Sequence, residues 1–172
     1  MTFLTAVDAC PHLVSPLALA HADSGGKLYS VPHLSLISRE FSRVIYAGGG
    51  ERTMVNAPPQ HAKSYTTSKY GCAWALLLFP DIRIVLVGYS EQFAAGWGAE
   101  VRDIIDRWGR PHGVRLRQDS SAKDEWKIDG HAGGMVCKGP KGGVTGRPVD
   151  LLLVDDLIKD HEQALSPGIM ES

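Results

Sequence analysis

The chain has 172 residues, of which 44% are hydrophobic and 22% are charged. This composition excludes an intrinsically disordered or fibrous protein, and the length predicts a single domain, since domains usually contain about 100–200 residues. The 18 Lys and Arg residues and 19 Asp and Glu residues give a net charge of −1. The chain therefore lacks the general basic excess of many nucleic-acid-binding proteins, and any contact with DNA has to come from a local patch.

The three cysteines are Cys10, Cys72 and Cys137. Their odd number and wide spacing fit neither a disulfide framework nor a C-x-x-C metal site, which favours a reducing, cytoplasmic setting. The seven histidines form no pattern typical of zinc proteins, so we expect no zinc site. No apolar run is long enough to span a bilayer, and no targeting segment is expected.

The sequence divides into an N-terminal arm and a larger α/β region. Residues 1–30 contain prolines and glycines without a sustained apolar period, which predicts a weakly ordered arm. In residues 31–172, segments with helical spacing alternate with short apolar runs rich in β-branched residues. This alternation predicts an α/β fold in which helices flank a mostly parallel sheet.

The elements of this α/β region follow from the same patterns. Helices are predicted over 33–46, 64–79, 91–108 and 158–164, and the first of them is ended by three consecutive glycines, 48–50. Strands are predicted over 52–56, 82–87, 126–128, 135–137 and 151–154.

The most informative segment is Ala-Pro-Pro-Gln-His-Ala-Lys-Ser, residues 57–64. A Lys-Ser pair that opens a helix after a tight loop is the context of a phosphate-binding P-loop, where backbone N–H groups and the helix dipole face the phosphates. Alanine occupies both glycine positions of the usual pattern, at Ala57 and Ala62. The alternative interpretation is a surface turn that opens a helix.

A second segment, Asp-Leu-Leu-Leu-Val-Asp-Asp at residues 150–156, has the form of a Walker B element. An apolar strand that ends in two acids places one carboxylate near Mg²⁺ while its neighbour orients the attacking water. The alternative is an aspartate that caps the following helix. Taken together and in this order, the two segments predict a nucleotide hydrolase.

At these residues the sequence resembles the large terminase subunit of tailed bacteriophages, the ATP-driven motor that packages DNA into procapsids. The resemblance extends from about residue 32 to 164. It includes three short segments between the two motifs that other P-loop ATPases do not share. They are Val-Gly-Tyr-Ser (87–90), Asp-Ser-Ser-Ala-Lys-Asp-Glu-Trp (119–126) and Gly-Gly-Val-Thr-Gly-Arg (142–147).

The resemblance implies a RecA-like P-loop ATPase fold of the additional-strand type, and roles for individual residues. Nucleotide binding would involve Pro59, Gln60, His61, Ala62, Lys63 and Ser64. Ser64 and Asp155 would hold Mg²⁺, and Asp156 would be the catalytic carboxylate. Relatives usually have glycine where Ala62 stands, so weakened ATP binding is expected.

Arg147 matches an arginine that in such motors reaches a nucleotide, in some cases on a neighbouring subunit, and would stabilise charge on the transferred phosphoryl group. The alternative is that Arg147 pairs with Asp150 or is solvated. A DNA-facing patch is suggested by Arg102, Arg107, Arg110, Arg115 and Arg117, for which a solvated helix face is the alternative.

The resemblance also implies ATP and Mg²⁺ as ligands, double-stranded DNA, a small terminase subunit and a portal protein as partners, a homo-oligomeric ring, and the cytoplasm of an infected bacterial host. The sequence stops after the Walker B segment, so we expect a partial ATPase domain without the nuclease domain and without the strand that follows Walker B in this class. Two alternatives stay open: a helicase-like nucleic-acid-dependent ATPase, and an inactive remnant or interaction module.

Overall fold

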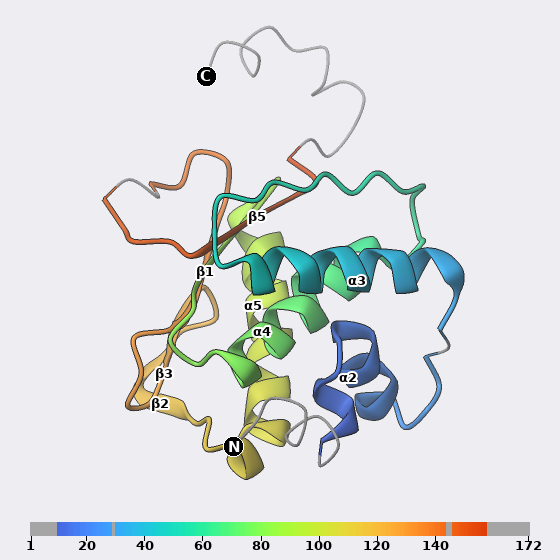
Figure 1. Cartoon of the computed structure of the whole chain (residues 1–172). Coiled ribbons are helices and arrows are strands. Elements are labelled where there is room, and N and C mark those ends of the chain that lie inside the picture. The colour runs from blue at the N-terminus through green and yellow to red at the C-terminus, as the bar shows by residue number, and fades with distance from the viewer. Residues whose placement is uncertain (1–9, 29, 144–145, 158–172) are drawn as a thin grey trace, which may run out of the picture.

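A five-stranded mixed sheet forms the centre of the computed structural model, which describes residues 10–28, 30–143 and 146–157 (Figure 1). The strand order is β2-β3-β4-β1-β5, with β1 at Arg83–Gly88, β2 at Leu116–Ser121, β3 at Glu125–Ile128, β4 at Gly134–Lys138 and β5 at Leu151–Asp155. β1 pairs in parallel with β4 and with β5, whereas β2, β3 and β4 pair antiparallel. The α/β prediction is confirmed, but the prediction of a mostly parallel sheet is wrong, because two of the four strand pairings are antiparallel. The connections between β2, β3 and β4 are short, and a short connection joins antiparallel strands.

The helices lie mainly on one side of the sheet (Figure 1). They are η1 (Pro11–Leu13), α2 (Pro16–Asp23), α3 (Pro32–Ala47), the π-helical η2 (Tyr65–Gly71), α4 (Cys72–Leu78), α5 (Glu91–Trp108) and η3 (Arg110–His112). α5 packs on β1 and β4. A Cβ on Gly98 would lie 2.6 Å from Cys137 Sγ and 2.7 Å from the Lys123 carbonyl oxygen, so a glycine is needed for this close approach.

The core is built from α4, α5 and the strands. Its largest fully buried side chains include Trp74, Trp126, Tyr70, Leu76, Ile84, Leu86, Ile104 and Ile128. Burial of each such side chain stabilises the fold by about 1.5–3 kcal/mol before entropy is counted. Among the described residues, no helix combines the length and the apolar character required to cross a bilayer.

The N-terminal arm is a correction to the sequence analysis. Within its described part, Pro16–Asp23 is a helix whose N-cap is Ser15, with the Ala18 N–H donating to Ser15 Oγ at 3.2 Å. Leu19 and Ala20 are buried in the main core, and Leu17 packs with Leu34 and Ile37 of α3. The segment is ordered by these tertiary contacts, which a search for local periodicity does not detect.

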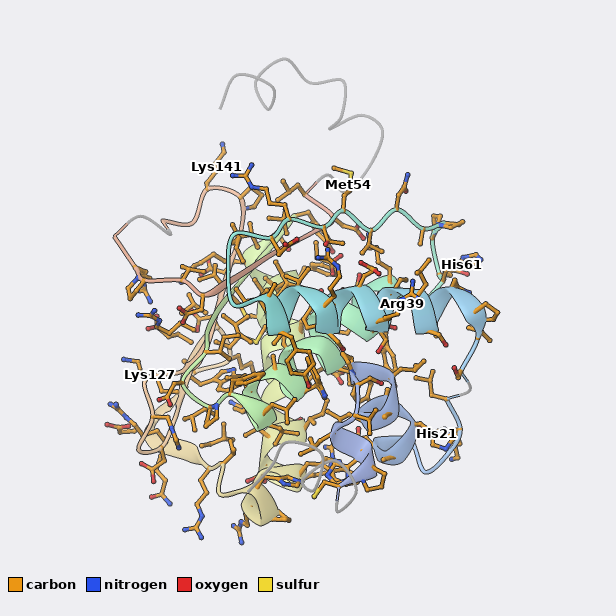
Figure 2. The ribbon with its side chains drawn as sticks, viewed as in Figure 1. His21, Arg39, Met54, His61, Lys127 and Lys141 are labelled. Carbon is orange, nitrogen blue, oxygen red and sulfur yellow. The ribbon has the colours of Figure 1, made fainter. Side chains whose placement is uncertain are left out.

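One further expectation differs from the structure. The stretch 52–56 has extended backbone but pairs with no other strand in the described part of the chain. It runs along α3 as an open segment that carries Met54, which is 93% exposed (Figure 2). The other expected helices and strands are present within the described residues, while the predicted helix over 158–164 lies outside them.

The helix predicted over 64–79 is present, with a π-helical first half. Thr66 Oγ1 donates to the Ala62 carbonyl at 2.9 Å, and Thr67 Oγ1 donates to the Lys63 carbonyl at 3.1 Å. Such hydroxyl groups compete with backbone N–H groups for the carbonyls of the preceding turn. π-helical turns often occur at functional sites, and this one directly follows the Lys-Ser pair.

Candidate nucleotide-binding site

The Lys-Ser pair meets the end of β5 at one edge of the sheet. Asp155, the last residue of β5, is paired with Gly88 at the end of the parallel strand β1. β4 lies on one side of β1 and β5 on the other, so the chain reverses its direction of winding at β1. In α/β proteins, ligands bind at such a switch point, outside the carboxyl ends of the strands.

Four side chains converge there from two segments about ninety residues apart. Lys63 Nζ lies 2.5 Å from Asp156 Oδ1 and 3.6 Å from Asp155 Oδ1. Ser64 Oγ donates a hydrogen bond of 2.9 Å to Asp155 Oδ1. The structure therefore brings together the four residues that the two sequence segments predict to act together.

The ammonium group of Lys63 is held in its charged form. Partial burial lowers the pKa of Lys63, but the hydrogen bond and charge of Asp156, together with Asp155, outweigh this effect and raise the pKa above its usual value. A lysine that stays protonated and is 24% exposed retains a full positive charge and remains accessible for an anionic ligand.

Asp155 is held from two sides and is only 5% exposed. Besides the Ser64 hydroxyl, Ser68 Oγ donates to Asp155 Oδ2 at 2.9 Å. Ser68 was missed by the sequence analysis. A hint was available, since Ser64 and Ser68 are four residues apart and share one face of the helix.

The loop before Lys63 has an unusual backbone. Gln60 and Ala62 have φ values of 62° and 55°, and Asp156 has a φ of 45°. The left-handed region costs a residue with a Cβ about 1 kcal/mol or more relative to glycine. Ala62 thus occupies the conformation that glycine would adopt without strain, as expected from the P-loop pattern.

The rest of the loop is open to solvent. Pro59, Gln60 and His61 are exposed, and a hydrogen bond of 2.8 Å joins His61 Nδ1 to the Pro59 carbonyl oxygen. Figure 2 shows His61 where the extended segment beside α3 turns toward the helix. The backbone N–H groups of this exposed loop can therefore be reached by an anion. The strained turn fixes the directions in which these N–H groups point.

Arg147 is not brought to this cluster. Its guanidinium donates to Glu125 Oε1 at 2.9 Å, and Asp150 is paired with Arg83 instead, at 2.7 Å. The alternative pairing of Arg147 with Asp150 is therefore wrong. Within one chain Arg147 touches none of Lys63, Asp155 and Asp156 in the contacts described.

A groove of about 1610 Å³ runs from the cluster along the outer edge of β5. Lys63, Ser68 and Asp155 line one end, and the extended segment around Arg52–Val55 and the apolar side of α3 line the wall opposite β5. Leu152 and Val154 of β5 are 56% and 55% exposed. The outermost strand of the described sheet thus leaves its free edge facing a wide apolar groove.

Three of the five arginines of the predicted DNA-facing patch lie beside acidic side chains. Arg107 donates to both carboxylate oxygens of Asp23, and Arg117 donates to both oxygens of Asp119. Arg102 lies 3.9 Å from Asp103. A DNA-facing role for these arginines stays a prediction.

The oxygen donors of the cluster suit a hard divalent cation. Ser64 supplies a hydroxyl and Asp155 a carboxylate, the ligand types that Mg²⁺ takes together with phosphate oxygens and water. Comparison with protein-family models, with curated proteins and with solved structures found no match to this chain.

Proposed function

We propose that this chain is a Mg²⁺-dependent ATPase whose centre is Lys63, Ser64, Asp155 and Asp156. The observation that carries the proposal is the convergence of these four side chains at the carboxyl end of a parallel strand, across a sequence separation of 91–93 residues. A surface turn or a simple helix cap would explain either segment alone, but not the contact between them. The P-loop character of the fold is part of the proposal.

The binding step follows from charge and backbone geometry. The ammonium group of Lys63 binds the terminal phosphates, and the N–H groups of residues 60–64 donate to the phosphate oxygens at the start of a helix. Pro59 and His61 shape the loop through their mutual hydrogen bond. Lys63 must exchange Asp156 for phosphate in this step, because the two are in direct contact in the unliganded chain.

The hydrolytic step follows from the release of Asp156. Once Lys63 has turned to phosphate, the exposed Asp156 carboxylate is available to orient a water molecule and to accept its proton. Ser64 and Asp155 would hold Mg²⁺, which would neutralise charge on the phosphates. Ser68 keeps the Asp155 carboxylate in position from its other oxygen.

We further propose that the ATPase belongs to a DNA-packaging motor of the phage terminase type. The support is the order of the segments along residues 32–164 and the contact between the first and last of them. This proposal includes double-stranded DNA, a small terminase subunit and a portal protein as partners, a homo-oligomeric ring, and the cytoplasm of an infected bacterium. Arg147 would then act on the nucleotide of a neighbouring subunit, after leaving Glu125. The groove beside β5 lies where this class has a further strand.

Two observations favour a second candidate, an inactive remnant. Ala62 holds a left-handed φ of 55° at a position where backbone approaches phosphate, and Lys63 is already paired with Asp156. Both features weaken nucleotide binding. The two candidates differ in a single measurable quantity, the rate of ATP hydrolysis.

The test is Mg²⁺-dependent ATP turnover by the purified chain, with and without linear duplex DNA, beside Lys63→Ala and Asp156→Ala variants. We expect each substitution to lower turnover by about 100-fold or more, since each removes a group that acts on the transition state. Lys141→Ala, which changes an exposed lysine labelled in Figure 2, serves as the matched control and should leave turnover unchanged. A folded wild-type chain without turnover, or turnover unaffected by both substitutions, contradicts the proposal.

A further inference from the structure

A second cluster of ligand-type side chains lies at the opposite end of the helical layer. Cys10 precedes η1, His12 lies in η1, and His112 ends η3, the short helix after α5. The Cys10 sulfur and one ring nitrogen of each histidine all lie within 4.8 Å of one another. The two imidazoles are joined directly, with His12 Nε2 and His112 Nε2 2.9 Å apart.

The two histidines favour their neutral forms. Burial lowers the pKa of His12, and the neighbouring His112 lowers it further, while burial also lowers the pKa of His112. A neutral imidazole has a free ring lone pair and is the form that binds transition metals. A hydrogen bond between two such nitrogens also requires that one ring accepts, so one ring directs its lone pair at the nitrogen of the other ring.

The surroundings restrict the rings to this arrangement. The His12 ring packs against Trp108 with 4.7 Å between ring centroids, and the turn after His112 is closed by Gly113 at a φ of 75°. The three side chains are each half-buried. The cluster therefore combines ligand-type atoms that already lie close together with partial exposure to solvent.

We propose that Cys10, His12 and His112 form a site for Zn²⁺, with water as the fourth ligand. One sulfur and two imidazole nitrogens are the donor set that zinc prefers, while Mg²⁺ and Ca²⁺ take oxygen ligands. A tetrahedral ion with bonds of about 2.0–2.3 Å separates its ligand atoms by about 3.3–3.8 Å. The histidine nitrogens need to move apart by only a few tenths of an ångström to meet this geometry.

The site would join parts of the chain that are 100 residues apart. η1 belongs to the N-terminal segment, and η3 follows the long helix α5, so a bound ion would fasten this segment to the core. A ligand that binds only the folded chain raises its stability by mass action. The expected effect is on stability, and it does not depend on the proposed ATPase activity.

The experiment uses the whole chain, stripped of metal, with Co²⁺ as a spectroscopic probe and Zn²⁺ as the competitor. We expect one Co²⁺ per chain, with the near-ultraviolet thiolate band and the visible bands of a tetrahedral site, both removed by an equivalent of Zn²⁺. Cys10→Ser should abolish the thiolate band, and His112→Gln should weaken Zn²⁺ binding by about 100-fold or more. His21→Gln, which changes an exposed histidine of α2, should leave binding unchanged.

The wild-type spectrum decides the proposal even if a variant fails to fold. A wild-type chain that binds Co²⁺ without a thiolate band, or that binds none, overturns it. Zn²⁺ binding of unchanged affinity in both Cys10→Ser and His112→Gln overturns it as well. A rise in melting temperature with Zn²⁺ in the wild type that is lost in Cys10→Ser supports it.

Discussion

Asp23 and Asp155 are both carboxylates with little exposed surface, 8% and 5% respectively, yet their surroundings differ in kind. Asp23 accepts hydrogen bonds from Tyr70 Oη and Trp108 Nε1, both at 2.8 Å, and from the Arg107 guanidinium. These donors come from two packed elements, η2 and α5, and join both of them to α2. Each acceptor position is used, so Asp23 has the features of a structural residue.

Asp155 receives its hydrogen bonds from two small hydroxyls on one helix, beside a second carboxylate and a partly exposed lysine. The backbone around it is strained at Ala62 and at Asp156. A wide groove begins at this point. The two acids are therefore alike in burial and differ in left-handed backbone, paired like charges and access to solvent, which are the features that mark Asp155 as the candidate functional residue.

The sharpest test of this difference is Asp23→Ala. It leaves the partly buried Trp108 N–H and the Tyr70 hydroxyl without Asp23 as acceptor and also removes the partner of Arg107. We expect the free energy of unfolding to fall by about 3 kcal/mol, measured by urea denaturation.

ATP turnover per folded molecule should be unaffected by Asp23→Ala. Asp81→Ala is the matched control, because Asp81 is 70% exposed and accepts from the Ala132 N–H and His131. We expect it to lower the stability much less than Asp23→Ala does. Equal losses from the two substitutions would contradict the structural role of Asp23.

The pH dependence of stability should also reveal the contribution of the charged Asp23 carboxylate. Burial raises the pKa of Asp23, but the hydrogen bonds from Trp108, Tyr70 and Arg107 outweigh it, and the net pKa lies below its usual range. The stabilisation is therefore complete above the pKa of the unfolded chain, about 3.9, and is lost as the pH falls through the lower pKa of the folded chain.

Urea denaturation at a series of pH values between neutral and strongly acidic checks this expectation. The stability difference between the wild type and Asp23→Asn should shrink as the pH falls through the acid range. A difference that stays constant with pH would show that the charge of Asp23 is not what stabilises the fold.

The smallest expected effect concerns the loop of the candidate site. Ala62→Gly removes the Cβ from a residue at a φ of 55°, and we expect a gain in stability of about 1 kcal/mol together with tighter nucleotide binding. Melting curves and titration with a fluorescent ATP analogue measure the two effects.

Ala57→Gly is the control for this prediction. Ala57 stands at the other glycine position of the P-loop pattern and has no left-handed φ. Glycine should bring no gain there, because it only adds freedom to the unfolded chain. A similar result for the two alanines would show that the strain at Ala62 is unimportant.

Much of the candidate site was predictable because each of its parts is a short sequence motif. Lys63 and Ser64 open a helix after a tight loop, and Asp155 and Asp156 end an apolar strand. Each segment carries its own signal in residue type and spacing, and the rule that ligands lie at the carboxyl ends of parallel strands places them together. Ser68 was recognisable only by its helical spacing from Ser64.

Other features have no local signal. The segment Pro16–Asp23 has no sustained apolar period, and we therefore expected it to be weakly ordered. Its helix is instead stabilised by contacts with α3 and the core. The sequence of residues 52–56 is typical of a strand, but a strand has to pair with the N–H and C=O groups of a neighbouring strand. A groove separates this stretch from β5, so it has no partner in the described part of the chain. The choice between Asp150 and Glu125 as partner of Arg147 also depends on distance in space.

The sequence by itself determined the α/β class, most helices and strands, and the four residues of the candidate nucleotide site, because periodicity and loop chemistry act over a few neighbouring residues. Only the tertiary structure decided that Asp23 joins three elements, that β5 faces a groove, and that Cys10 and His12 meet His112. These contacts join residues 47 to 100 positions apart. No local pattern encodes such a contact, since its energy comes from groups that meet only after the chain has folded.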